Sequence, residues 1–218
     1  YVEHGFLDDV NAIYGVHIWG DLDAPYMNFE SGPRMASCDN FRIEVEGKSA
    51  HGSTPHQGVD AILAAAHIIT EIQTVVSRMN DPLNPLVITV GTINGGQRFN
   101  ILADKVVMEG TTRTHSPKMR QKTEPLLRRI IENTADSMGA KATLTFEYFP
   151  APIINDHEDL VRIARNAATK MYGTDSLKPF PKMMISEDFA YYMEKVPGVF
   201  GLVGSQNRDL GITAKNHN

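Results

Sequence analysis

Three histidines stand in settings where an imidazole could do chemistry, namely His17, His51 and His217. His17 lies in an apolar run, residues 13–19, just before a polar stretch at residues 20–23. Such a run is typical of a strand buried on both faces of a parallel sheet. It places His17 at the carboxyl end of the strand, where open α/β sheets keep their sites. A core histidine bonded to a carbonyl is the alternative interpretation.

His217 follows a loop after the last predicted strand, residues 199–204. If the two outer parts of the chain share one sheet, His17 and His217 converge at its carboxyl edge. Converging imidazoles suit a borderline metal such as zinc. Their wide spacing matches no ligand motif, so the spacing alone leaves a metal site open.

His51 lies in a loop of small residues, 47–56, that leaves a predicted strand. Small and flexible neighbours let the ring project, as expected of a hydrogen-bond donor to developing negative charge. A solvated loop histidine is the alternative. Asn100 and Arg113 could hold a carbonyl or a carboxylate, although a turn former and a surface ion pair explain them equally well.

The middle of the chain, residues 37–150, combines half-buried strands with amphipathic helices. We predict strands over residues 41–47, 86–93, 106–114 and 142–149, and helices over residues 60–80 and from Ser116 to about residue 138, with Pro125 kinking the second helix or displacing its start. This order is that of the split βαβ, ferredoxin-like unit, with four antiparallel strands and both helices on one face. Its edge strands are natural places for a second copy to pair.

The outer zones, residues 1–36 and 151–218, have α/β character. We expect a helix that is capped by Asn155 or Asp156 and ends at Gly173, a short helix through residues 191–193, and a buried strand over residues 199–204. The simplest topology is one α/β domain interrupted by a ferredoxin-like insert.

The composition narrows the class of protein. The 218 residues are 42% hydrophobic with a net charge of −5 that is spread along the chain, which argues against a nucleic-acid partner. No window resembles a membrane span, so we expect no membrane partner. The single cysteine, Cys38, fits a reducing compartment and predicts a cytoplasmic protein. The first residues read as the end of a helix, so we expect a segment of a longer protein.

Together, several stretches resemble the dinuclear metallohydrolases that include N-acyl-amino acid amidohydrolases, hippurate hydrolase, auxin-conjugate hydrolases and aminoacylase-like carboxypeptidases. The similar stretches run nearly end to end and in the same order: residues 9–17, 47–51 with 55–56, 73–82, 95–96 with 100–102, 110–114, 186–189 and 217–218.

The resemblance implies a partial zinc-peptidase-like α/β catalytic domain, residues 1–36 and 151–218, interrupted by a dimerisation insert, residues 37–150. It implies two divalent metal ions per subunit, zinc or manganese, with His17 and His217 as ligands. It assigns substrate contacts to Asn100 and Arg113, and places His51 of the partner subunit at the oxyanion of the intermediate. Glu187 and Asp188 would lie beside the site in unassigned roles, with a helix N-cap as the alternative for Asp188.

The activity implied is hydrolysis of the amide bond of N-acyl-amino acids or small peptides by a metal-activated water, in a homodimer. The family's Cys-Gly-His stretch and its Glu-Glu pair, which includes the general base, are not in this sequence, and Ala103 stands where the family usually has proline. We therefore expect the segment alone to be inactive. The alternative is a ferredoxin-like dimerisation or small-molecule-binding module without catalysis.

Overall fold

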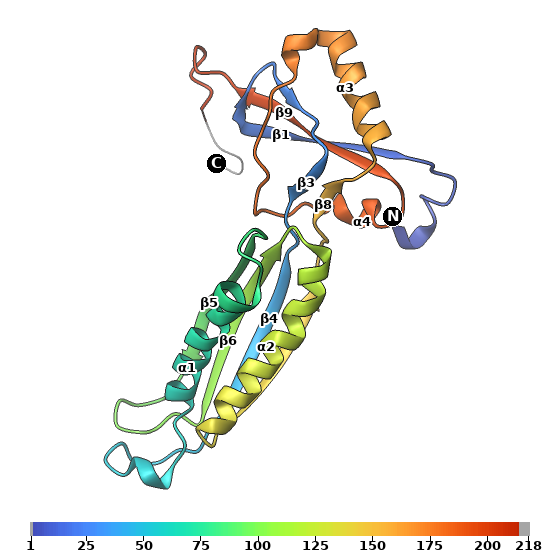
Figure 1. Cartoon of the computed structure of the whole chain (residues 1–218). Coiled ribbons are helices and arrows are strands. Elements are labelled where there is room, and N and C mark those ends of the chain that lie inside the picture. Colours follow the sequence, from blue (N-terminus) through green and yellow to red (C-terminus); the bar gives the residue numbers. More distant parts are fainter. Residues whose placement is uncertain (1, 214–218) are drawn as a thin grey trace. The chain divides into compact units, whose positions relative to one another are not determined.

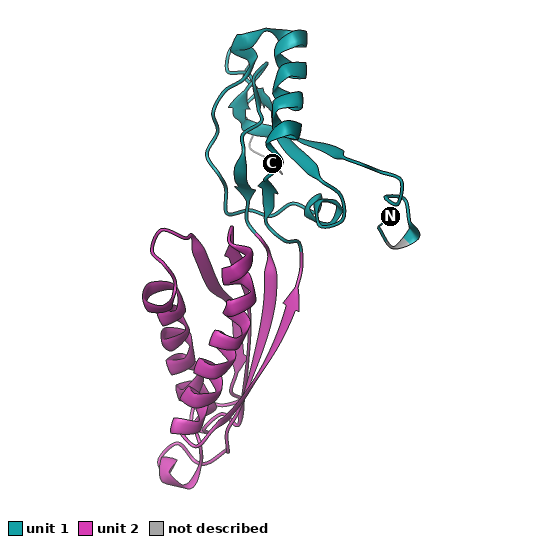
Figure 2. Cartoon of the chain, turned by 45° about the vertical axis from the view of Figure 1, so that its right-hand side comes forward, with its two compact units in different colours: residues 1–36, 150–218 teal, residues 37–149 magenta. Residues whose placement is uncertain are grey.

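A computed structural model describes residues 2–213 of the chain. The chain divides into two compact units. Unit 1 joins residues 1–36 to residues 150–218, and unit 2 is the intervening stretch, residues 37–149 (Figure 2).

Unit 2 is a four-stranded antiparallel sheet with two helices on one face (Figures 1 and 2). The strand order across the sheet is β5-β6-β4-β7. Its elements follow the chain as β4 (Asp39–Glu46), a 3-10 turn (Pro55–Gln57), α1 (Ala61–Thr74) continued by a π-helical turn (Val75–Met79), β5 (Leu86–Gly95), β6 (Lys105–Thr114), α2 (Pro117–Ser137) and β7 (Lys141–Tyr148).

Local sequence signals explain where these elements begin. In β4 every second side chain, Phe41, Ile43 and Val45, is buried against the helices, as strand alternation requires. The Asp60 carboxylate accepts two backbone N–H groups at the start of α1, and Ser116 accepts one at the start of α2. The cap at Ser116 decides the start of α2. The helix therefore begins at Pro117 and runs through Pro125, which does not displace it.

Unit 1 is built on the three-stranded sheet β1-β9-β2, in which β1 and β9 are parallel. A two-stranded ribbon, β3 with β8, accompanies it. The elements are β1 (Ile13–Asp23), β2 (Met27–Asn28), β3 (Gly32–Met35), β8 (Ile153–Asn155), α3 (Glu158–Tyr172), α4 (Ala190–Met193) and β9 (Gly198–Gln206), with 3-10 turns at Val2–His4 and Thr174–Ser176.

The strand that is buried on both faces is β9, not β1. One apolar cluster packs Phe200 and Leu202, and a second cluster, which includes α3, packs Val199 on the other face. In β1 the side chains Tyr14, Val16 and Ile18 are 56%, 47% and 58% exposed. The prediction of a doubly buried β1 is wrong because, in the described part of the chain, β1 is the edge strand and the cluster at α3 includes none of these three residues.

The predicted cap of α3 is also wrong. Its N-cap position is His157, without a side-chain bond. Asn155 is instead fully buried in β8, where its side chain bonds the backbone N–H and C=O of Phe200 and the carbonyl of Glu30. A cap must bond the next turn of its own helix, whereas Asn155 bonds a strand 45 residues away.

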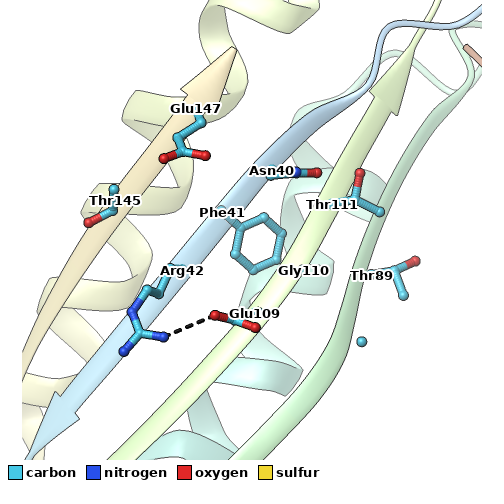
Figure 3. A pocket seen from close by; sticks show the side chains of 10 residues that line it. Asn40, Phe41, Arg42, Thr89, Glu109, Gly110, Thr111, Thr145 and Glu147 are labelled. Carbon is cyan, nitrogen blue, oxygen red and sulfur yellow. Dashed lines mark hydrogen bonds and ion pairs between the residues drawn. The ribbon is translucent and has the colours of Figure 1, made fainter. Parts of the chain in front are cut away.

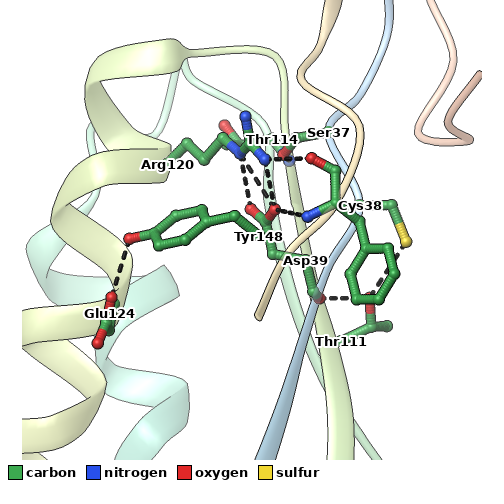
Figure 4. A network of polar contacts seen from close by, with 9 residues as sticks. Ser37, Cys38, Asp39, Thr111, Thr114, Arg120, Glu124 and Tyr148 are labelled. Atoms are coloured by element: carbon green, nitrogen blue, oxygen red, sulfur yellow. Dashed lines mark hydrogen bonds and ion pairs between the residues drawn. The ribbon is translucent and has the colours of Figure 1, made fainter. Parts of the chain in front are cut away.

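A buried ion pair fastens the two ends of unit 2 together (Figure 4). Asp39, 1% exposed, accepts bonds from the Arg120 guanidinium and from the backbone N–H of Phe149. Arg120 also donates to the carbonyl of Phe149 and lies over the Tyr148 ring, 5.3 Å from its centroid. One guanidinium thus links the first strand of unit 2 to its last residue. We call Asp39, Arg120 and Phe149 the clamp.

Candidate functional site

His17 is half-buried in the middle of β1, opposite Leu202 of β9. The strand continues to Asp23, so the prediction that it ends near His17 is wrong. The ring packs edge-on against Trp19 at 5.4 Å between centroids. Nδ1 lies 2.6 Å from the carbonyl oxygen of Ile18, which can only accept, so Nδ1 carries a hydrogen. In the neutral ring the lone pair is therefore on Nε2, the atom a metal would take.

Glu187 lies beside this lone pair, with Oε2 at 3.9 Å from Nε2 of His17. Burial raises the pKa of the Glu187 carboxyl, a hydrogen bond with Asp188 raises it further, and His17 opposes both effects. A carboxyl that resists ionisation beside an imidazole is a common feature of functional sites. Asp188 is no helix cap, since α4 begins at Ala190 without a side-chain cap.

A buried polar network holds the segment that carries Glu187. Arg34, 8% exposed, donates to Asn28 and to the carbonyl of Phe180, and its guanidinium pairs with Glu30 at 3.1 Å. Beyond Phe180 the segment follows β3, with Met183 N–H bonded to the carbonyl of Arg34. Residues remote in sequence thus hold the segment that carries Glu187 near His17, and the sequence analysis expected Glu187 there only through the family resemblance of residues 186–189.

The predicted second ligand, His217, lies outside the described residues. Within residues 2–213, no group of three or more His, Cys, Asp or Glu side chains is arranged to hold a metal. This part of the chain therefore offers one imidazole and a neighbouring carboxyl, which is less than a complete metal site.

The loop of His51 is tied down by backbone bonds, contrary to the flexibility expected from its small residues. Lys48 exchanges two backbone bonds with Val59, and Ala50 accepts one from Leu102. The glycines permit this close pairing, because a Cβ on Gly47 would lie 2.3 Å from the carbonyl oxygen of Val59.

This pairing brings His51 and Asn100 together. His51 bridges to Ile101, and the N–H of the next residue, Gly52, donates to the carbonyl of Asn100 at 2.8 Å. Both side chains are exposed. Nδ1 of His51 accepts the backbone N–H of Ser53 at 3.2 Å and lies 2.6 Å from the Ser53 hydroxyl oxygen. Ser53 is a contact that the sequence analysis missed, although it stands only two residues from His51.

Arg113 lies at the opposite end of the same sheet. Lys105, at the start of β6, pairs with Glu46, just before the His51 loop, whereas Arg113 pairs with Val87 near the strand's end. The β6 backbone from Lys105 to Arg113 spans about 27 Å at about 3.4 Å per residue. Arg113 and His51 of one chain therefore cannot contact the same small substrate.

A shallow cavity of about 540 Å³ lies on the sheet face that the helices leave open (Figure 3). Two of its charged lining residues, Arg42 and Glu109, are hydrogen bonded to each other at 3.0 Å. Neither His51 nor Asn100 lines it. The cavity has no evident relation to the candidate residues.

Within residues 2–213, none of the helices combines the length and apolar character that crossing a bilayer requires.

Residues 38–138, which lie within unit 2, match the family model of the peptidase dimerisation domain. The chain is 37% identical to an N-acetyl-L-cysteine deacetylase of Bacillus subtilis over 94% of this chain and 48% of the relative. It is 34% identical to an IAA-amino acid hydrolase of Arabidopsis thaliana over 99% of this chain and 50% of the relative. The resemblance seen in the sequence is thereby confirmed.

Solved structures agree. A putative aminohydrolase of methicillin-resistant Staphylococcus aureus superposes with a TM-score of 0.85 at 30% identity, over 94% of this chain and 53% of that one. A dinuclear metal-binding peptidase of the M20 family from Bacillus subtilis superposes with a TM-score of 0.77 at 31% identity. The match covers 94% of this chain and 51% of that one. The chain thus spans about half the length of the relatives it matches.

Proposed function

We propose that this chain is part of a metal-dependent amidohydrolase that cleaves the amide bond of N-acyl-amino acids or small peptides. The observation that carries the proposal is the His17 imidazole, whose Nε2 lone pair faces the Glu187 carboxyl. The likeness to a deacetylase of N-acetylcysteine and to an IAA-amino acid hydrolase supports the substrate class.

In this proposal unit 2, within residues 37–150, is a ferredoxin-like insert through which two copies form a homodimer. Its βαββαβ order and its antiparallel arrangement β5-β6-β4-β7 support that assignment. Residues 1–36 and 151–218 belong to a zinc-peptidase-like catalytic domain. The reducing compartment that suits the free Cys38 supports a cytoplasmic location.

The metal in this proposal is a pair of divalent ions, zinc or manganese. The donor chemistry of His17 fits, because its Nδ1–H is bound by a carbonyl and its Nε2 is left as the ligand atom. His217 is the second proposed ligand from this chain. When bound, such ions supply an activated water and polarise the scissile carbonyl.

The remaining proposed residues bind and orient the substrate. His51 donates a hydrogen bond to the oxyanion, and Asn100 and Arg113 hold the carbonyl or carboxylate. Arg113 and His51 are too far apart along β6 to meet in one subunit, which supports an active site shared between two subunits. His51 and Asn100 then come from one subunit, and Arg113 comes from the subunit that supplies His17.

A dimerisation or small-molecule-binding module without catalysis is not favoured. A module of that kind would match only over unit 2, whereas the likeness to hydrolases extends over 94% to 99% of the chain.

The test is His51→Ala in the complete, metal-loaded hydrolase. Loss of one oxyanion donor costs about 2.7 to 4 kcal/mol of barrier, so turnover falls by about two to three decades. His67→Ala, which alters an exposed histidine on α1, is the matched control and keeps full turnover. Undiminished turnover of His51→Ala at unchanged metal content contradicts the proposal.

A further inference from the structure

We propose that Ser53 holds the His51 imidazole in the tautomer that carries its hydrogen on Nε2, which makes Ser53 a positioning residue for the oxyanion donor. This inference rests on the proposed function of His51 and adds the group that prepares the ring for it. The tautomer itself is a property of the chain that can be measured without any substrate.

The hydrogen bonds at Nδ1 determine the tautomer. The backbone N–H of Ser53 points at Nδ1 from 3.2 Å, and a backbone N–H can only donate. The Ser53 hydroxyl oxygen lies 2.6 Å from the same nitrogen and can donate to it as well. Nδ1 is therefore the acceptor with its lone pair, and the single hydrogen of the neutral ring is on Nε2.

The turn that carries Ser53 is rigid enough to keep this arrangement. The carbonyl of His51 accepts both the backbone N–H of Thr54, at 2.8 Å, and its hydroxyl, at 3.3 Å. On the other side, Gly52 is bonded to the Asn100 carbonyl. Ser53 thus lies between two anchored residues, and its N–H has a fixed direction.

The consequence is a neutral histidine that is ready to donate. Within residues 2–213, no group bonds Nε2 of His51, whose side chain is exposed. A hydrogen on this atom stabilises an oxyanion, whereas the other tautomer would present a lone pair and repel it. The Ser53 hydroxyl and N–H therefore select the productive form before the substrate binds.

The imidazole ¹⁵N resonances of the labelled chain test the proposal directly. They are recorded at a pH at which His51 is neutral. The expected wild-type result is a protonated Nε2 and an unprotonated Nδ1. Ser53→Ala should move the two resonances toward each other, because only the backbone N–H, at 3.2 Å from Nδ1, then remains to favour the Nε2–H form. Ser53→Thr should restore the wild-type pair. Ser49 lies in the same loop as His51, and its hydroxyl donates to the carbonyl of Leu102. The control variant Ser49→Ala should leave both His51 resonances unchanged.

Two results would overturn the inference: a wild-type ring with its hydrogen on Nδ1, or His51 resonances in Ser53→Ala that equal those of the wild type. Because the wild-type spectrum alone fixes the tautomer, a poorly folded variant does not remove the test.

Kinetics of the complete, metal-loaded hydrolase separate this inference from the proposed function. Ser53→Ala should lower kcat by about threefold to tenfold, the worth of one neutral hydrogen bond, and Ser53→Thr should recover it. KM should stay within about twofold of the wild-type value, because the His51 donor acts in the transition state and not in substrate binding. Full turnover of His51→Ala would refute the proposed function while the resonances still decide the tautomer. If His51→Ala loses its turnover and Ser53→Ala keeps full turnover, only the positioning role of Ser53 is refuted.

Discussion

One hydrogen bond at Nδ1 gives His17 and His51 opposite chemistry. The carbonyl of Ile18 accepts from Nδ1 of His17 and leaves a lone pair on Nε2. The N–H of Ser53 donates to Nδ1 of His51 and leaves a hydrogen on Nε2. The same side chain can thus serve as a metal ligand in one unit and as a hydrogen-bond donor in the other, because the backbone around each ring differs.

The raised pKa of Glu187 predicts a pH-dependent stability. Burial disfavours its ionised form in the folded chain. Its contribution is therefore fully present below the ordinary value of 4.5 and is lost as pH rises through the raised pKa. Glu187→Gln, which stays neutral, should match the wild type in acid and become the more stable protein by about pH 8.

Urea unfolding of the metal-free chain measures the effect of Glu187→Gln across this pH range. Glu194→Gln is the control, because it makes the same chemical change at an exposed side chain of unit 1. A stability difference between Glu187→Gln and the wild type that is constant with pH would contradict burial as the cause of the shift.

At the scale of the element, the clamp joins the first strand of unit 2 to the end of its last strand. Asp39 and Arg120 are 1% and 12% exposed at their side chains, so each charge depends on the other. Asp39→Asn leaves the Arg120 guanidinium buried without its counter-charge. The free energy of unfolding should fall by about 3 to 5 kcal/mol.

Denaturant titration with a probe in unit 2 checks the clamp. Lys105→Ala, also in unit 2, removes an ion pair with Glu44 whose side chains are 52% and 34% exposed. This control should change stability by no more than about 1 kcal/mol. Equal losses for Asp39→Asn and Lys105→Ala would show that burial of the clamp adds nothing.

The elements of unit 2 could be predicted because their signals are local. Asp60 and Ser116 bond N–H groups two or three residues away, and the alternation of β4 is visible in the sequence. The burial of β1 and the role of Asn155 could not, since both depend on partners far along the chain. The type of residue at 155 favoured a cap, but its amide bonds Phe200.

The same difference between local signals and distant partners applies to the candidate site. The chemistry of His17 and His51 could be inferred from residue type and motif, and it stays a prediction until tested. The nearness of His51 to Asn100 arises from pairing between residues 50–52 and 100–102. The nearness of Glu187 to His17 arises from the Arg34 network. Neither pairing follows from local periodicity or residue type, and only the family resemblance led us to expect Glu187 beside the site.

At the scale of the whole molecule, the proposed sharing of one site between two subunits predicts that inactive variants complement each other. Mixed with His17→Ala, His51→Ala should regain activity, because one site of the mixed dimer then has its own His17 and the partner subunit's His51. At random pairing the recovery is about a quarter of wild-type activity.

Arg113→Ala distinguishes the two subunits in this experiment. Mixed with His51→Ala it should also recover, since the intact residues meet in one site. Mixed with His17→Ala it should not, because Arg113 and His17 are assigned to the same subunit. Recovery in that last mixture would place Arg113 with His51 instead.

The length of β6 has a consequence for regulation. If its two ends serve different active centres, an isolated copy holds two half-sites that never meet, whatever its loading with metal. Output would then rise faster than linearly with protein at low abundance. A copy with a defective metal site would still complete its neighbour, so the cell would tolerate some damaged chains before losing the reaction.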